Sequence, residues 1–187
     1  GGVSLPILYK DLVIVNASVE SGDLVALNKA NGEEVWRAPG MNRSWNTPHL
    51  VTTRSGKQEL VVTVKDLILG FDPASGQELW RCDAIPDYIC PSIISHDGIV
   101  YALGGRKSMT IAVRSGGRGD VSATHKLWEA EVGANVCSPV LHNGHLYWVS
   151  DRNQTAYCLD AKNGTVAYEE KVDIQPYASA LSTDRRL

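Results

Sequence analysis

The stretch GEEVWRA, residues 32–38, returns 44 positions later as GQELWRC, residues 76–82. Each copy begins with a glycine and places a Trp-Arg pair four and five residues after it. A match at a fixed interval indicates an internal repeat, and the length of a repeat constrains the fold more strongly than any single residue does.

Two markers recur in the same phase along the chain. The aromatic marker is found at Trp36, Trp80, Trp128 and Tyr168. The proline marker is found at Pro6, Pro48, Pro91 and Pro139, at intervals of 42, 43 and 48 residues. We therefore predict a single domain of four units, residues 5–46, 47–89, 90–137 and 138–178, with the start of a fifth unit over residues 179–187.

Each unit has the pattern of four short strands. In the fourth unit, apolar runs flank Asn143-Gly144, a strong hairpin signal because both central residues of a type I′ turn need positive φ. No apolar segment of ten or more residues has the 3.6-residue period of a helix. Repeats of this length and pattern predict an all-β fold, a β-propeller with about four four-stranded antiparallel blades.

The composition excludes several classes of protein. The chain has 187 residues, 43% of them hydrophobic, and a net charge of −3. This acidic balance argues against a protein that binds nucleic acid or an anionic membrane surface, since either needs a basic face. No apolar run approaches the roughly 18 residues of a membrane span. Because the chain begins with Gly-Gly and ends at TDRRL, we expect it to be part of a longer protein.

Three segments carry a family resemblance. ALNKANGEEVW (26–36), GFDPASGQELW (70–80) and CLDAKNGTVAY (158–168) resemble the tryptophan-docking motif of pyrroloquinoline-quinone-type propeller repeats, Ala-x-Asp-x-x-x-Gly-x-x-x-Trp. The resemblance implies that each Trp lies flat against the neighbouring blade. A buried Trp covers up to about 250 Å², which corresponds to roughly 5 kcal/mol.

The resemblance assigns structural roles to the residues that match the motif. These docking residues are Trp36, Trp80, Trp128, Tyr168, Gly32, Gly76, Gly164, Asp72 and Asp160. Small residues at Ala26, Gly70, Ala112 and Cys158 leave room for packing. The third unit departs from the motif, because Arg114 stands in place of the Asp and a glycine-rich excursion of about eight extra residues follows it.

The resemblance also bears on activity. Enzymes of the family have a disulfide between adjacent cysteines, a calcium ion and a catalytic Asp in the axial funnel, whereas this chain has no Cys-Cys pair and no acidic residue that maps onto the catalytic position. We therefore predict no enzyme activity, no cofactor and no metal. The chain instead resembles the other branch of the family, that of the outer-membrane assembly lipoprotein and of the propeller sensors of bacterial receptor kinases.

That branch implies a non-catalytic scaffold with a protein partner, in an exported bacterial protein of the periplasm or the extracellular space. The alternatives are a fragment of a quinoprotein dehydrogenase and a ligand-sensing domain of a receptor-like Ser/Thr kinase. Two copies related by a two-fold axis could also complete an eight-bladed ring.

The segments that precede the innermost strands are the candidate binding site, at one mouth of the axial channel. The residues assigned to it are Arg43, Trp45, Asn46, Tyr88 and Tyr177. Polar and aromatic groups that meet in a concavity are typical of a ligand site. A water-filled opening with no specific ligand is the alternative.

Three smaller features have simpler alternatives. His142 and His145 flank a two-residue turn and could share a metal, or be solvated. Arg118-Gly119-Asp120 spells an integrin-binding tripeptide that also arises by chance. Cys90 and Cys137 both precede inner strands, where they are either free thiols or a disulfide.

Overall fold

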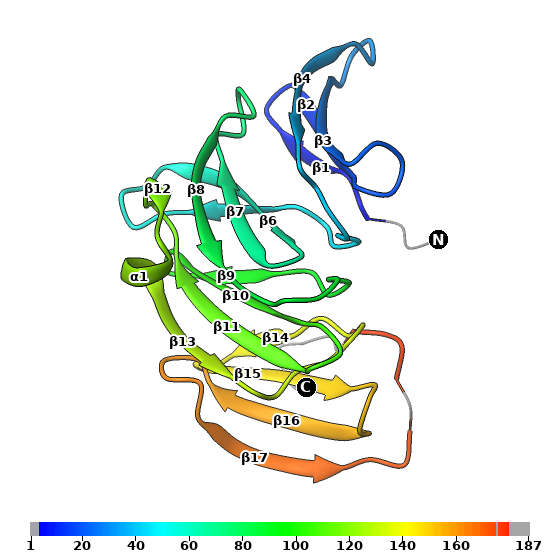
Figure 1. Ribbon diagram of the computed structural model, residues 1–187, viewed down its shortest axis with the longest axis vertical. Coiled ribbons are helices and arrows are strands. Elements are labelled where there is room, and N and C mark those ends of the chain that lie inside the picture. Colours follow the sequence, from blue (N-terminus) through cyan, green and yellow to red (C-terminus); the bar gives the residue numbers. More distant parts are fainter. Residues whose placement is uncertain (1–3, 175, 180–187) are drawn as a thin grey trace.

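The computed structural model describes residues 4–174 and 176–179, which form four antiparallel sheets arranged along an arc (Figure 1). Sheet 1 contains β1 (Ile7–Tyr9), β2 (Leu12–Ala17), β3 (Asp23–Asn28) and β4 (Glu34–Pro39). Sheet 2 contains β5 (His49–Thr52), β6 (Gln58–Val64), β7 (Leu67–Phe71) and β8 (Glu78–Asp83), with β12 (Gly119–Asp120) added at its edge. Sheet 3 contains β9 (Ile94–His96), β10 (Ile99–Gly104), β11 (Met109–Arg114) and β13 (Lys126–Ala130). Sheet 4 contains β14 (Val140–His142), β15 (His145–Ser150), β16 (Thr155–Asp160) and β17 (Val166–Lys171).

Apart from β12, the strands of each sheet follow one another in chain order, and each pairs with its neighbours in antiparallel fashion. Among the described residues the only helix is the single turn α1 (Ser122–His125). The predicted fold class, an all-β partial β-propeller with about four blades, is therefore confirmed. No helix in the described part of the chain is long and apolar enough to span a membrane.

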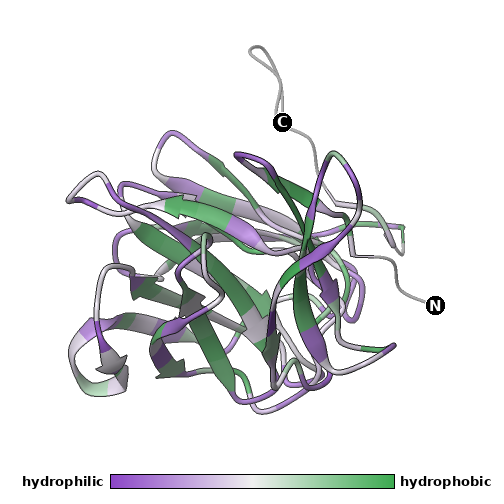
Figure 2. Ribbon diagram, turned by 90° about the horizontal axis from the view of Figure 1, so that it is seen from above, coloured by the Kyte–Doolittle hydropathy of each residue, from purple (hydrophilic) through white to green (hydrophobic). Residues whose placement is uncertain are grey.

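The hydrophobic core is divided into three clusters, and each cluster lies between two consecutive sheets. The first joins sheets 1 and 2, the second joins sheets 2 and 3, and the third joins sheets 3 and 4. Figure 2 shows the apolar residues on the strands and the polar residues mainly on the connecting loops. Apolar burial between the sheets is thus the main term that holds them together.

The burial of a strand depends on whether its sheet has a neighbour on each face. In β6 of sheet 2, all residues from Glu59 to Val64 are buried, as expected for a strand covered on both sides. In β2 of sheet 1, only Ile14 and Asn16 are buried, and they alternate with half-buried residues. The described chain covers only one face of sheet 1, so the period of two remains visible there.

The same irregularity occurs in all four sheets where the third strand pairs with the outermost one. The small residue of each third strand lies opposite the aromatic marker: Ala26 opposite Trp36, Gly70 opposite Trp80, Ala112 opposite Trp128, and Cys158 opposite Tyr168. A shift of register follows directly after the small residue in each case. Such a bulge bends the strand and changes the direction in which a side chain points.

In sheets 1, 2 and 4 the bulge is followed by a compact turn that is closed by an Asx side chain. Asp72 Oδ1 accepts a hydrogen bond from Ala74 N at 2.7 Å, and Asp160 Oδ1 accepts one from Lys162 N at 2.7 Å. Asn28 Oδ1 does the same for Ala30 N at 2.8 Å. These side chains satisfy amides that the strands leave unpaired.

Two of the tryptophans lie on the turn of the next sheet. The Trp36 indole N–H donates to Pro73 O at 3.2 Å, and a Cβ on Gly76 would come within 2.5 Å of the Trp36 ring. Trp128 donates in the same way to Ala161 O at 3.1 Å, and a Cβ on Gly164 would lie 2.4 Å from its ring. Each ring therefore needs a glycine in the turn beneath it.

In each of the two end sheets, one partner of this contact is missing within the described chain. A Cβ on Gly32, in the turn of sheet 1, would have no atom within 4 Å. At the other end, Tyr168 of sheet 4 is 53% exposed and all residues of β17 are exposed. The first turn in the described chain thus holds no aromatic ring, and the last aromatic marker lies on no turn.

Trp80 has a different partner. It is fully buried in the cluster between sheets 2 and 3, but its indole N–H donates to Glu59 Oε2 of its own sheet at 2.8 Å. Glu59 is only 2% exposed, and it also accepts hydrogen bonds from Gly116 N at 3.0 Å and from Arg118 at 3.1 Å. The buried carboxylate therefore fastens the excursion of the third unit onto sheet 2.

The excursion adds a strand to the neighbouring sheet. Gly119 and Asp120 form β12, which pairs in parallel with Trp80 and Arg81 of β8. Asp120 Oδ1 accepts hydrogen bonds from both the amide and the hydroxyl of Ser122. The Arg118-Gly119-Asp120 tripeptide is thus part of a sheet edge, although its residues are exposed.

A second set of contacts between sheets runs along the segments at the start of the innermost strands. Each backbone amide in the set donates to a hydroxyl of the following unit: Leu5 N to Thr47 Oγ1 (3.0 Å), Thr47 N to Ser92 Oγ (3.3 Å), Ser92 N to Ser138 Oγ (2.9 Å) and Ser138 N to Ser179 Oγ (2.9 Å). We call these four bonds the hydroxyl ladder. Ser179 therefore accepts from Ser138 the same bond that Ser138 accepts from Ser92. The rest of the predicted fifth unit, residues 180–187, lies outside the described residues.

A matched pair of glycine substitutions tests the contact between Trp36 and its turn. Gly76 and Gly32 have nearly equal φ values of +71° and +76° in equivalent turns, so Gly→Ala costs about 1–2 kcal/mol at either position through backbone strain. Only Gly76→Ala also forces a methyl group into an indole, which adds about 1–3 kcal/mol. We expect a lower urea midpoint for Gly76→Ala than for Gly32→Ala, and equal midpoints would contradict the contact.

Candidate functional site

The two segments that lead into the inner strands of sheets 2 and 3 lie side by side. Ile89 N donates to Arg43 O at 3.0 Å, and Trp45 N donates to Ile89 O at 2.8 Å, so that Ser44 and Ile89 form a parallel bridge. Arg43 adopts a φ of +50°. This backbone pairing fixes the spacing of the side chains that the sequence placed at the channel mouth.

Trp45, Tyr88 and Arg106 form one cluster, which we call the mouth cluster. The Trp45 and Tyr88 rings meet edge to face, with centroids 5.8 Å apart and planes at 87°. The Arg106 guanidinium lies over the Tyr88 ring, 5.2 Å from its centroid. Both rings are half-buried, and Arg106 is exposed. Such a cluster presents aromatic faces that are already held in place by their neighbours.

The mouth cluster rests on a buried polar network between sheets 1 and 2. Asn16 Nδ2 donates to Ser44 Oγ and to Asn46 O, both at 2.9 Å, and Asn46 Nδ2 donates to Ser44 Oγ at 3.0 Å. Ser44 Oγ in turn donates to Thr63 O at 2.9 Å. Asn46 is fully buried and cannot contact a ligand from solvent, so it supports the mouth rather than lining it.

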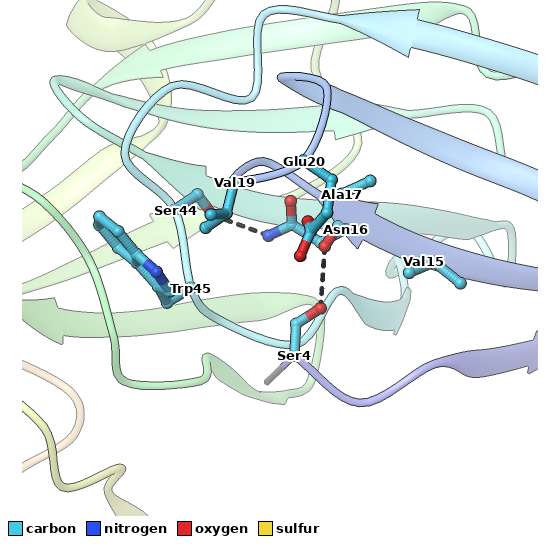
Figure 3. Close-up of a pocket in the computed structure, with 8 residues that line it drawn as sticks. All are labelled: Ser4, Val15, Asn16, Ala17, Val19, Glu20, Ser44 and Trp45. Atoms are coloured by element: carbon cyan, nitrogen blue, oxygen red, sulfur yellow. Dashed lines mark hydrogen bonds between the residues drawn. The ribbon is translucent and has the colours of Figure 1, made fainter. Parts of the chain in front are cut away.

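A cavity of about 280 Å³ opens beside this network (Figure 3). Trp45 forms one side of it, and Ser44, Asn16 and Val19 line it as well, with Val19 drawn beside Ser44 and 59% exposed. Ser4 Oγ donates to Asn16 O at 3.0 Å and helps to enclose the space. The sequence analysis missed Asn16 and Val19, and the only signal was a polar residue at the end of the apolar run LVIV.

Tyr177 is not part of the ring contacts that form the mouth cluster. It is 68% exposed, and among residues 4–174 and 176–179 it makes no ring contact with Trp45 or Tyr88. Of the residues predicted for the mouth, the structure therefore brings together Arg43, Trp45 and Tyr88.

The carboxylates near the mouth are engaged by backbone amides. Asp87 accepts hydrogen bonds from Arg106 N and from Tyr88 N, both at 2.8 Å. The bond from Arg106 N is the main reason that the pKa of Asp87 is lower than usual. Asp151 Oδ1 accepts bonds from Asn135 N at 2.7 Å and Val136 N at 3.2 Å. Both carboxylates thus act as caps for the backbone.

The residues present do not fit a quinone held by calcium. Within the described part of the chain, no three His, Cys, Asp or Glu side chains lie close enough together to hold a metal ion. His142 and His145 pair across their turn, and each has a ring nitrogen about 3.0 Å from a polar atom of Asn143.

All four cysteines are free thiols. Cys90 is half-buried, and burial raises the pKa of its thiol. Cys137 is 1% exposed, and burial raises the pKa of its thiol to about 11. The alternative of a disulfide between them is not realised in this structure.

Comparisons with known proteins now bear on the site. The sequence profile of the family described as Outer membrane protein assembly factor BamB matches residues 20–89 and 89–170. No curated protein sequence is significantly similar to this chain.

Among solved structures, BamB from Moraxella catarrhalis is similar with a TM-score of 0.53 and 14% identity, over 86% of this chain and 58% of that one. Quinohemoprotein alcohol dehydrogenase from Comamonas testosteroni is similar with a TM-score of 0.68 and 12% identity, over 91% of this chain and 35% of that one. Hsv2 from Kluyveromyces lactis is similar with a TM-score of 0.57 and 11% identity, over 90% and 50%. At these identities the similarity shows the fold alone, and the chain spans about a third to three fifths of each of these structures.

The raised pKa of Cys137 predicts a pH dependence of stability. Between pH 9 and 11 the unfolded thiol loses its proton while the folded thiol keeps it, so the free energy of unfolding falls as pH rises. Cys137→Ala should make this slope shallower by up to about 1.4 kcal/mol per pH unit. Urea titrations at several pH values measure how the free energy of unfolding depends on pH, and Val136→Ala is the control. An unchanged slope in Cys137→Ala would contradict the assignment.

Proposed function

Because the chain belongs to the family of the outer membrane protein assembly factor BamB, we propose that it is a non-catalytic β-propeller scaffold that binds a protein partner. In this proposal it is part of a larger exported bacterial protein, located in the periplasm or the extracellular space. The family description, which refers to assembly at the outer membrane, supports both the location and the protein-binding role.

The mouth cluster is the observation that carries the proposal. Trp, Tyr and Arg are the residue types that contribute most to protein–protein interfaces. Here Trp45 and Tyr88 are held by backbone pairing and by each other, so little side-chain entropy would be lost when a partner binds. The cavity beside Trp45 gives a projecting partner side chain a place to enter.

The mouth also lacks the features that favour a catalytic alternative. Its carboxylate Asp87 is hydrogen bonded to two amides, and its pKa is lowered rather than raised toward neutrality. The similarity to quinohemoprotein alcohol dehydrogenase is one of fold at 12% identity. A fragment of a quinoprotein dehydrogenase is therefore the weaker proposal.

Site-specific photo-crosslinking in cells that produce the full chain tests the proposal. A photoreactive phenylalanine analogue replaces Trp45 or Tyr88, and the control position is Glu129, an exposed residue of β13. We expect an adduct of one discrete mass at the two mouth positions and none at Glu129. Arg106→Glu, which changes the exposed part of the cluster, should reduce the yield severalfold.

Two results would count against the scaffold. One is equal adduct formation at Glu129 and at the mouth, or no adduct at all. The other is dye reduction by the purified full chain that depends on added pyrroloquinoline quinone and Ca²⁺, which would favour the dehydrogenase alternative.

A further inference from the structure

A second cavity, of about 570 Å³, lies between sheets 3 and 4. Arg114, the last residue of β11, and Leu127 of β13 line it from sheet 3. Ala161 and Lys162, in the turn after β16, line it from sheet 4. Its volume lies within the range of about 300–1,000 Å³ that is typical of ligand sites.

The cavity opens where sheet 3 departs from the other sheets. In sheets 1, 2 and 4 a compact Asx turn joins the third strand to the outermost one. In sheet 3 the chain leaves β11 at Arg114, pairs with the edge of sheet 2 as β12 and returns through α1. Arg114, where the excursion begins, and Leu127, the second residue of β13, where it ends, both border the cavity.

The charged groups at the cavity are mainly basic. Arg54, Arg114 and Lys162 line it, together with His96 and one acidic residue, Asp97. Asp97 is already paired with Arg54 at 2.9 Å. Arg114 and Lys162 are exposed and form no ion pair with any residue in the described ranges. This excess of positive charge occurs in a chain whose net charge is −3.

The remainder of the lining is largely apolar. Ile99 and Leu141 are half-buried, Tyr101 is 3% exposed, and Leu127 is 36% exposed. An apolar surface bordered by unpaired cations fits a ligand that presents both carboxylates and an apolar group. A simple inorganic anion would leave the apolar surface in contact with water.

We propose that this cavity binds an acidic, extended segment of a partner polypeptide. Carboxylates of the segment pair with Arg114 and Lys162, and an apolar side chain between them packs on Leu127 and Ile99. This inference rests on the proposed protein-binding function and adds to it a second contact surface with a defined chemistry. Sheet 3 provides the surface because its connection is diverted onto sheet 2.

Fluorescence anisotropy with the full chain tests the inference. The probe is a labelled hexapeptide in which Glu or Asp alternates with Leu or Phe, and the control peptide has Lys in place of the acids. We expect saturable binding of the acidic peptide only, weakened by added salt. Arg114→Glu and Lys162→Glu should each raise its Kd about tenfold.

The matched control is Arg152→Glu, which makes the same charge change at the opposite end of β15 and should leave the Kd within about twofold of wild type. Thermal unfolding midpoints verify that the variants remain folded. Absence of saturable binding, an equal loss in Arg152→Glu, or displacement of the peptide by equimolar succinate would overturn the inference. If the wild-type chain does not bind the peptide but still forms crosslinks at Trp45, this cavity alone is rejected. If the wild-type chain binds the peptide but forms no crosslinks at Trp45, the mouth cluster alone is rejected.

Discussion

The contact between an indole ring and a glycine in the turn of the next sheet is the constraint on which the rest of this structure depends. Each sheet has two faces, and a face is stabilised only when another sheet covers it. At the outer edge, Trp36 of sheet 1 lies on the turn of sheet 2 that contains Gly76, and Trp128 of sheet 3 lies on the turn of sheet 4 that contains Gly164. The hydroxyl ladder joins the same sheets at the start of the inner strands. Contacts at both edges fix the angle between neighbouring sheets and thereby the arc.

The parts of the fold that the sequence predicts are those set by local spacing. The strands and hairpin turns follow from residues close together in the chain, and the repeat follows from one pattern that recurs at intervals of about 40 to 48 residues. The parts it does not predict join residues far apart in the chain. Glu59 and Gly116 are 57 residues apart, and the members of the hydroxyl ladder are 41 to 46 apart. At the mouth, the spacing identified Trp45 and Tyr88, but it could not show that the pairing of their segments buries Asn46.

Sheet 3 differs from the other three sheets in the connection between its third strand and its outermost strand. Sheets 1, 2 and 4 keep the compact turn, while sheet 3 gives it up and fastens its excursion to sheet 2 through the buried Glu59 carboxylate. The loss of one turn is tolerated because Trp80 finds a hydrogen-bond partner within its own sheet. The cavity bordered by Arg54, Arg114 and Lys162 lies where this connection leaves sheet 3.

A double-mutant cycle on Trp36→Leu and Gly76→Ala tests the central contact most directly. The free energy of unfolding of the full chain is measured for the wild type, both single variants and the double variant. If the ring lies on the glycine, the methyl group of Gly76→Ala should cost much less once the ring is gone, and the coupling energy should be about 1–3 kcal/mol. Additive effects, within about 0.5 kcal/mol, would contradict the contact and with it the account of how the sheets are held together.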